Sequence, residues 1–200
     1  MAKKSTYNAK DIEVLEGLEP VRKRPGMYIG STNQDGLHHL VNEVLDNSID
    51  EVLAGHATDI SFQYKKDGTI KIKDNGRGIP IDFHPKYKNK RALEVVLTTL
   101  HAGGKFNSNA YKTSGGLHGV GISVVNALSS LLQVQVYKDG KVYRQDYSKG
   151  KVKTKIKIEK CSKKLKGTEI SFIPDESIFE ETQFVPKKLY NFINMLFSIE

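Results

Sequence analysis

The longest run of regularly spaced hydrophobic residues lies at positions 37–54, and its spacing predicts a helix. Apolar side chains recur there every three or four residues, so they share one face that can pack against a sheet. These side chains are Val41, Val44, Leu45, Ile49 and Val52. Glu43, Asn47 and Asp50 fall on the opposite face. Gly55 follows the last apolar position and predicts the end of the helix.

Alternation of apolar and polar residues predicts several strands elsewhere in the chain. The expected strands cover residues 59–64, 69–73, 131–137, 141–147, 152–158 and 168–173. Asp67-Gly68 joins the first two, and Asp139-Gly140 joins the next two. Such Asp-Gly pairs between alternating segments are typical of β-hairpins.

Shorter helical patterns complete the expected elements, at residues 11–18, 93–100, 121–128 and 186–197. The basic segment 21–32 contains Pro25, Gly26 and Gly30, and it predicts a loop or turn. Hairpins join most of the strands, while the helices cluster in the first half and at the end. The sequence therefore predicts an α+β fold, with a mixed, mostly antiparallel sheet and helices on one face.

Length and composition indicate one compact domain over residues 1–200. The chain is 38% hydrophobic, which is enough for a core. No segment approaches 18 consecutive apolar residues, so we expect no membrane span. The N-terminus lacks the apolar core of a secretory signal. The single cysteine, Cys161, has no partner for an internal disulfide and fits a reducing, cytoplasmic location.

The formal net charge of +8 is concentrated in residues 138–166, which hold 12 Lys or Arg against 3 Asp or Glu. Lysines alternate with apolar residues and a threonine at 151–158, as in a strand with one solvated face. We expect them to protect an exposed sheet edge. A surface that attracts nucleic acid is the alternative. No aromatic residues interleave with these lysines, which argues against stacking with single-stranded bases.

Residues 101–121 carry six glycines and few large apolar groups, and a loop of this length inside a domain is usually functional or disordered. The segment 115–121 opens the helix expected at 121–128. Its backbone N–H groups, with the positive end of that helix, suit a phosphate. The spacing matches neither the P-loop nor the dinucleotide motif. A flexible glycine hinge remains the alternative.

Two further groups of residues point to chemistry. Asp74 follows a strand, so its carboxylate could accept a hydrogen bond at the floor of a pocket, and Gly76 and Gly78 would let the backbone approach a flat ring. On the helix, Glu43 and Asn47 would combine a proton acceptor with a neutral oxygen ligand for a hard cation. Taken singly, an ordinary turn and a solvated helix face explain these two groups as well.

Taken together, Glu43 with Asn47, Asp74-x-Gly76-x-Gly78 and the glycine segment resemble the ATP site of the GHKL superfamily. This superfamily includes the B subunits of type II topoisomerases, Hsp90 chaperones, MutL proteins and histidine kinases. The resemblance implies the Bergerat fold, a two-layer sandwich.

Longer motifs make the resemblance more specific. RKRPGMYIG, DNSIDE, and HAGGKF leading into SGGLHGVG are similar to the B subunits of DNA gyrase and topoisomerase IV. AKDIEVLEGLEP and the short segment after Pro80 are more similar to topoisomerase IV. The resemblance covers about residues 7–174. Lys138 stands where these B subunits often carry an arginine.

The resemblance implies roles for individual residues. Glu43 would be the general base for the water that attacks the γ-phosphate of ATP, and His39 would orient it. Asn47 would ligate Mg²⁺. Asp74 would accept a hydrogen bond from the adenine amino group. The other residues with an implied role in nucleotide binding are Tyr7, Arg77, Gly78, Ile79, Pro80, Lys105, Tyr111, Gly116, Leu117, His118, Gly119, Val120, Gly121 and Thr168.

The implied function is that of the ATP-hydrolysing domain of a type IIA DNA topoisomerase, which drives clamp closure and DNA strand passage. The partners would be a second copy, contacted through an arm at residues 1–15, the topoisomerase A subunit and double-stranded DNA. Residues 101–121 would be the ATP lid. The transducer and later domains of the family are absent, so we expect this chain to bind ATP and Mg²⁺ but to hydrolyse ATP slowly.

Three other functions compete with this interpretation. An ATP-driven clamp of the MutL or Hsp90 kind is the main alternative. A histidine kinase would need a phosphoacceptor helix upstream, and only about eleven residues precede the first expected helix. A nucleotide-binding module without catalysis is the third.

Overall fold

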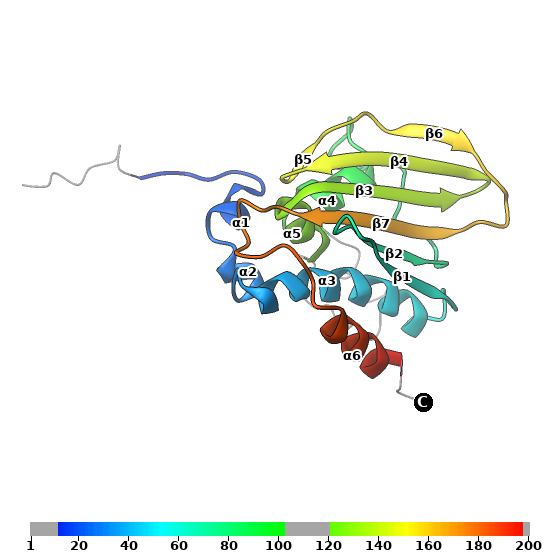
Figure 1. Ribbon diagram of the computed structural model, residues 1–200. Helices are drawn as coiled ribbons and strands as arrows, with labels where there is room; N and C mark the ends of the chain where they lie inside the picture. Colours follow the sequence, from blue (N-terminus) through cyan, green and yellow to red (C-terminus); the bar gives the residue numbers. More distant parts are fainter. Residues whose placement is uncertain (1–11, 103–120, 198–200) are drawn as a thin grey trace, which may run out of the picture.

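A single antiparallel sheet forms one layer of the structure, and helices form the other (Figure 1). This computed structural model describes residues 12–102 and 121–197, with side chains up to residue 195. Within those residues, seven strands pair in the order β1-β2-β7-β3-β4-β5, and β6 also pairs with β4. The strands are β1 Ile60–Tyr64, β2 Ile70–Asp74, β3 Ser129–Lys138, β4 Lys141–Ser148, β5 Lys151–Val152, β6 Lys157–Lys160 and β7 Gly167–Pro174.

The helices are α1 Glu19–Lys23, α2 Gly26–Ile29, α3 Gln34–Leu53, α4 Ala92–Thr98, α5 Gly121–Ala127 and α6 Pro186–Phe197. The helices α3, α4 and α5 share the hydrophobic core with the sheet and cover one side of it, called here the inner face. The helix α6 lies beyond α3, on the side away from the sheet (Figure 1). The predicted α+β sandwich with helices on one face is confirmed. No helix in the described parts has the length and hydrophobicity needed to cross a bilayer.

The predicted central helix is confirmed as α3, and it begins three residues earlier than the hydrophobic pattern indicated. Asn33 caps it, because its side-chain oxygen accepts a hydrogen bond from the backbone N–H of Asp35 at 2.9 Å. Of the apolar residues, Val41, Val44 and Leu45 are buried, whereas Val52 in the last turn is 39% exposed. Gly55 follows the helix with φ of +74°.

Most of the remaining expected elements are confirmed. The two hairpins are β1–β2 and β3–β4, with their predicted Asp-Gly turns between the strands. The helices expected near residues 93–100, 121–128 and 186–197 are α4, α5 and α6.

The chain before α3 differs from expectation. The helix expected at 11–18 is wrong, because the described residues 12–18 contain no helix, and Gly17 turns the chain with φ of +58°. The loop expected at 21–32 is also wrong, because α1 and α2 occupy much of it. Pro20 lies in the first turn of α1 and Pro25 precedes α2. At these positions proline starts a helix rather than interrupting one.

The continuous strand expected at 152–158 is split into β5 and β6, which both pair with β4. Between them the chain leaves the sheet edge. Asp146 of β4 holds this detour, because its backbone carbonyl accepts from the N–H of Lys153 at 2.8 Å and its own N–H donates to Oγ1 of Thr154 at 3.0 Å. Lys151 and Lys157 therefore lie at an edge of the sheet, as predicted, whereas Lys153 and Lys155 lie in the segment between the two edge strands.

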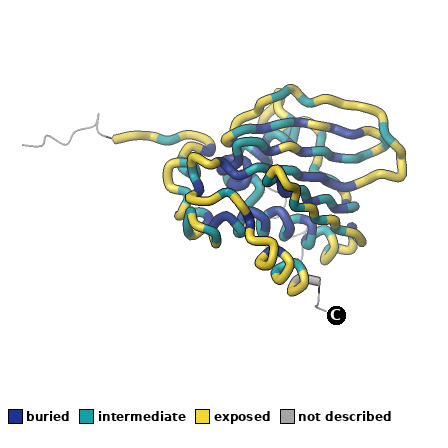
Figure 2. The backbone as a smooth tube through the Cα atoms, in the orientation of Figure 1, coloured by how far each residue is buried: buried dark blue, intermediate teal, exposed yellow. Residues whose placement is uncertain are grey.

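Burial follows the two layers (Figure 2). Residues of α3 and α5 pack against alternate residues of the strands in one hydrophobic core. On the opposite, outer face of the sheet, polar side chains pair across strands. Lys71 forms a 2.7 Å ion pair with Glu169, and Gln135 donates to the same carboxylate at 3.0 Å. Among the described residues, no helix covers this polar outer face.

A buried carboxylate ties α1 and α5 to the end of β7. Asp175 is 1% exposed and accepts from Arg22 of α1 at 2.7 Å, while Lys149 lies 3.3 Å away. The other guanidinium nitrogen of Arg22 donates to the carbonyl of Ala127, at the end of α5, at 2.7 Å. Burial alone would raise the pKa of Asp175, but hydrogen bonds from Arg22, Ser177 and Lys149 lower it to about 2.

We expect Asp175→Asn to lower the free energy of unfolding by about 2–4 kcal/mol at pH 7, because it leaves Arg22 without its buried counter-charge. The pKa of Asp175 falls from 3.8 to about 2 on folding, so its contribution is present above about pH 4 and disappears as the pH falls to 2. Urea unfolding followed by circular dichroism between pH 2 and pH 7 measures both effects.

The matched control is Asp35→Asn, which removes an exposed ion pair with Lys188 and should cost less than about 1 kcal/mol. Equal losses for the two variants would contradict a special role for the buried pair.

Candidate nucleotide site

Asp74 lies at the meeting point of three elements. It ends β2, on the same side of the strand as Ile70 and Ile72, and is therefore directed toward the inner face, where it is 6% exposed. One carboxylate oxygen accepts from the backbone N–H of Gly76 at 2.8 Å and from that of Thr168 in β7 at 3.3 Å. The other accepts from the hydroxyl of Ser48 in α3 at 3.3 Å.

Burial raises the pKa of Asp74, the hydrogen bonds from Gly76, Thr168 and Ser48 oppose this change, and the nearby charge of Glu51 adds to it. A carboxylate with two oxygens has more acceptor capacity than these three donors use. The group is therefore suited to a ligand that presents a hydrogen-bond donor, such as an exocyclic amino group.

Two glycines let the backbone after Asp74 pack directly on the start of β7. Gly78 has φ of +76°, and a Cβ there would lie 2.9 Å from the side chain of Val136 in β3 and 3.2 Å from the backbone oxygen of Gly167 at the start of β7. Gly167 has φ of +106°, and a Cβ there would lie 2.0 Å from the backbone oxygen of Asp74. Beside them, the N–H of Ile79 donates to the hydroxyl of Thr168 at 3.2 Å. The structure thus brings together Asp74, Gly78, Ile79 and Thr168.

Arg77 and Pro80 are exposed beside this group. Arg77 makes a two-pronged ion pair with Glu51 of α3, with nitrogen–oxygen distances of 2.7 and 3.2 Å, and its backbone N–H donates to the same carboxylate at 2.9 Å. Glu51 was absent from the predicted site. The signal for it was available, since Glu51 follows Glu43 and Asn47 at intervals of four residues on one side of α3.

The second half of the site lies nearer the start of α3. Nε2 of His39 is 3.0 Å from one oxygen of Glu43, and the side-chain amide of Asn47 donates to the backbone carbonyl of Glu43 at 2.7 Å. The hydrogen bond with Glu43 raises the pKa of His39 against the opposing effect of burial, and the charges of Glu43 and Asp46 add to the rise. A protonated His39 would place a positive charge beside Glu43.

The other oxygen of Glu43 lies against the start of α5. A Cβ on Gly121 would fall 1.9 Å from this oxygen, so the last residue of the glycine segment reaches the Glu43 carboxylate only because it has no side chain. Tyr7, Lys105, Tyr111 and the rest of the predicted glycine contacts, residues 116–120, lie outside the described residues.

The donor set around Asn47 fits a magnesium ion that is held mainly by phosphates and water. No cluster of three or more His, Cys, Asp or Glu side chains able to hold a metal occurs in the described ranges, so an all-protein cage is absent there. Mg²⁺ in nucleotide sites is often bound through one or two protein oxygens together with substrate phosphates. The amide oxygen of Asn47, one turn from Glu43, is the group that would supply such a ligand.

The two halves of the site share one helix. Glu43 and Glu51 are eight residues apart, which is about 12 Å along the axis of α3. A ligand that contacts both halves must therefore be extended, with a hydrogen-bond donor at the Asp74 end and charged groups at the Glu43 end.

A cavity of about 960 Å³ lies elsewhere, between α1 and the β4–β5 turn, and none of the predicted site residues lines it.

A family model described as "Histidine kinase-, DNA gyrase B-, and HSP90-like ATPase" matches residues 32–178. That span contains α3, β2, α5 and β7, and with them every described side chain around Asp74 and Glu43. The chain belongs to this ATPase family.

Individual members of the ATPase family match more of the chain. It is 63% identical over 187 residues to the B subunit of DNA topoisomerase 4 from Rickettsia bellii, and 58% identical over 180 residues to the B subunit of DNA gyrase from Thermotoga maritima. These matches cover 93% and 90% of this chain, respectively, but only 28% of each relative. The predicted resemblance to the two kinds of B subunit is confirmed.

Solved structures of the same ATPase family share the fold. The 43K ATPase domain of Thermus thermophilus gyrase B, in complex with an aminocoumarin, superposes with a TM-score of 0.78 at 41% identity, over 90% of this chain and 44% of that chain. The topoisomerase IV ATP-binding domain of Francisella tularensis, in complex with a small-molecule inhibitor, gives a TM-score of 0.76 at 41% identity, over 90% of this chain and 47% of that chain.

We expect Asp74→Asn to weaken ATP binding about 10- to 100-fold, because an amide donor would face the adenine amino donor. The free energy of unfolding should not fall, since folding already disfavours the ionised form of Asp74. Isothermal titration calorimetry and urea unfolding measure the two quantities. Asp59→Asn, at an exposed position just before β1, is the control. Undiminished ATP affinity in the Asp74 variant would remove this residue from the site.

Gly167→Ala should lower the free energy of unfolding by at least about 3 kcal/mol, because its Cβ would overlap the backbone oxygen of Asp74. Gly68→Ala has a similar positive φ but open space around the new Cβ, and should cost about 1–2 kcal/mol. Thermal unfolding of the two variants isolates the steric contribution. Similar losses would show that backbone strain alone accounts for the effect at Gly167.

Proposed function

We propose that this chain is the ATP-binding and ATP-hydrolysing domain of the B subunit of a type IIA DNA topoisomerase, of the topoisomerase IV kind. The observation that carries the proposal is the arrangement on α3, which holds Glu43 and His39 at one end and supports Asp74 through Ser48 at the other. This arrangement suits an adenine base and a triphosphate lying along one helix. The identities with the B subunits of topoisomerase 4 and gyrase support the same conclusion.

In this proposal the two oxygens of Glu43 have different tasks. One lies 3.0 Å from Nε2 of His39, which fixes the orientation of the carboxylate. The other faces Gly121 and would accept a proton from the water that attacks the γ-phosphate. Mg²⁺ bound by Asn47 would neutralise charge on the phosphates. Asp74 would select adenine, with Thr168 and Ile79 beside it.

The activity of the whole protein is part of the proposal, because the chain spans 28% of the length of the relatives it matches. We infer that ATP closes a dimer clamp on double-stranded DNA, in a cytoplasmic complex with the topoisomerase A subunit. A second copy would be contacted through the N-terminal arm at residues 1–15, as the family resemblance implies. Tyr7 and the lid residues Lys105 and Tyr111 would complete the nucleotide contacts.

We expect Glu43→Gln to reduce ATP turnover at least about 100-fold while ATP affinity stays within about threefold of the unchanged chain. Glutamine keeps the size of the side chain and can still pair with His39, but it is not a base. A coupled assay for phosphate release and calorimetry with a non-hydrolysable ATP analogue measure the two effects.

The control for this experiment is Asp35→Asn, in the exposed first turn of the same helix. Unchanged turnover in the Glu43 variant would refute its role as base. A failure of the unchanged chain to bind ATP would overturn the proposed function itself.

A further inference from the structure

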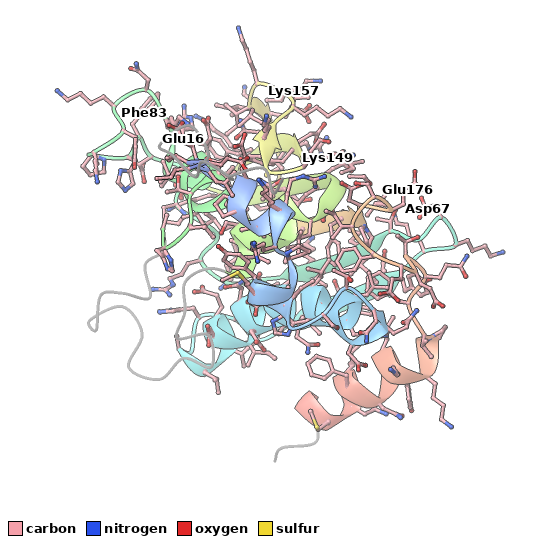
Figure 3. The ribbon with its side chains drawn as sticks, turned by 90° about the vertical axis from the view of Figure 1, so that its left-hand side faces the viewer. Glu16, Asp67, Phe83, Lys149, Lys157 and Glu176 are labelled. Atoms are coloured by element: carbon pink, nitrogen blue, oxygen red, sulfur yellow. The ribbon has the colours of Figure 1, made fainter. Side chains whose placement is uncertain are left out.

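The sheet edge beside β4 carries a dense group of lysines, which we call the lysine edge. Residues 151–166 contain eight lysines and one acidic residue, Glu159. All eight lysines are exposed; they are Lys151, Lys153, Lys155, Lys157, Lys160, Lys163, Lys164 and Lys166. Figure 1 shows β5 and β6 along the rim of the sheet farthest from α3, and Figure 3 shows Lys157 extending from that rim into solvent.

These charges are not neutralised within the described part of the chain. None of the eight lysines forms an ion pair there with a carboxylate within 4.0 Å, and Glu159 lies 3.4 Å from Arg144 instead. Unpaired charges of one sign repel one another and weaken the fold. Stability of the fold therefore does not explain why the lysines are concentrated at one edge.

Protection of the sheet edge accounts for only part of the group. Lys151, Lys157 and Lys160 lie in the edge strands β5 and β6, where charged side chains block pairing with another sheet. The other five lie in the segments 153–156 and 161–166, which have no open strand ladder to protect. The segment 153–156 leaves the sheet between β5 and β6, so it already interrupts the sheet edge there.

We propose that the lysine edge binds the phosphate backbone of double-stranded DNA. This inference rests on the proposed function, which requires the protein to hold a duplex. Lysines supply point charges for phosphates, and such contacts are independent of base sequence. Residues 151–166 contain no aromatic side chain on which single-stranded bases could stack, so the surface favours a duplex.

The dimensions of the edge fit a short length of duplex. β5 pairs with one end of β4 and β6 with the other, so the lysines are distributed along the eight residues of β4, which extend over about 27 Å. A duplex carries one phosphate per strand every 3.4 Å, so about eight base pairs cover this length. Several phosphates of one duplex can therefore contact the lysines at the same time.

The test replaces four lysines from the connecting segments by glutamine: Lys153, Lys155, Lys163 and Lys164. Binding to a fluorescent 24-base-pair duplex is measured by anisotropy between 50 and 200 mM KCl. We expect affinity at 100 mM KCl to fall at least about tenfold, and the slope of log affinity against log salt to decrease by about two to four.

The matched control removes four exposed lysines away from the lysine edge: Lys65 and Lys66 in the β1–β2 turn, and Lys86 and Lys88 in the loop before α4. Its net charge changes equally, and its affinity should change less than about twofold. Equal losses in both variants, or no loss in the first, would overturn the proposal. The pairs Lys153/Lys155 and Lys163/Lys164 are also replaced separately, in case the fourfold variant does not fold.

Two further measurements separate DNA from an acidic protein as the partner, and the lysine edge from the nucleotide site. Polyglutamate of matched charge tests the acidic protein, and binding as tight as to the duplex would overturn the proposal in favour of that partner. ATP affinity is measured on the same samples. Retained ATP binding without a loss of DNA binding in the lysine-edge variant overturns only this inference, whereas absence of ATP binding in the unchanged chain overturns the proposed function.

Discussion

The carboxylate of Asp74 is the point on which the arrangement of the site depends. Its three donors come from α3, from the turn after β2 and from the start of β7, so one buried acid holds a helix and two strands at fixed positions. Burial of a carboxylate is unfavourable, and the raised pKa of Asp74 reflects that cost. The hydrogen bonds reduce the cost without removing it, which leaves an acceptor poised for a further donor.

The helix α3 gives the site its length. A helix is rigid over the distance between Glu43 and Glu51, so residues at four-residue intervals keep a constant spacing on one side. The opposite side of the helix is buried in the core through Val41, Val44 and Leu45. Packing of this buried side therefore fixes the positions of the polar side chains on the other side. The geometry of the site thus depends on the hydrophobic core.

The fold was largely predictable because its elements follow local rules. Spacing of apolar residues located α3, and Asp-Gly turns located the two hairpins. The helices α1 and α2 were missed because Pro25, Gly26 and Gly30 were interpreted as signs of a loop, although proline also starts helices. The split between β5 and β6 depends on hydrogen bonds with Asp146 on a neighbouring strand, and no local pattern contains that information.

The candidate site was also predictable from local patterns only in part. Local spacing on α3 indicated Glu43 with Asn47, whereas Thr168 lies 94 residues from Asp74, and only the sheet order places β7 beside β2. The role of Thr168 was therefore available from the family resemblance and not from its own surroundings in the sequence.

The close contact between Gly167 and the backbone of Asp74 has a consequence for variation within the family. At this contact, main chain packs directly against main chain, so a side chain cannot be added at Gly167 without displacing a strand. Differences in ligand preference between family members should therefore accumulate around Arg77 and Pro80. These positions are exposed, so a new side chain there extends into solvent without a clash.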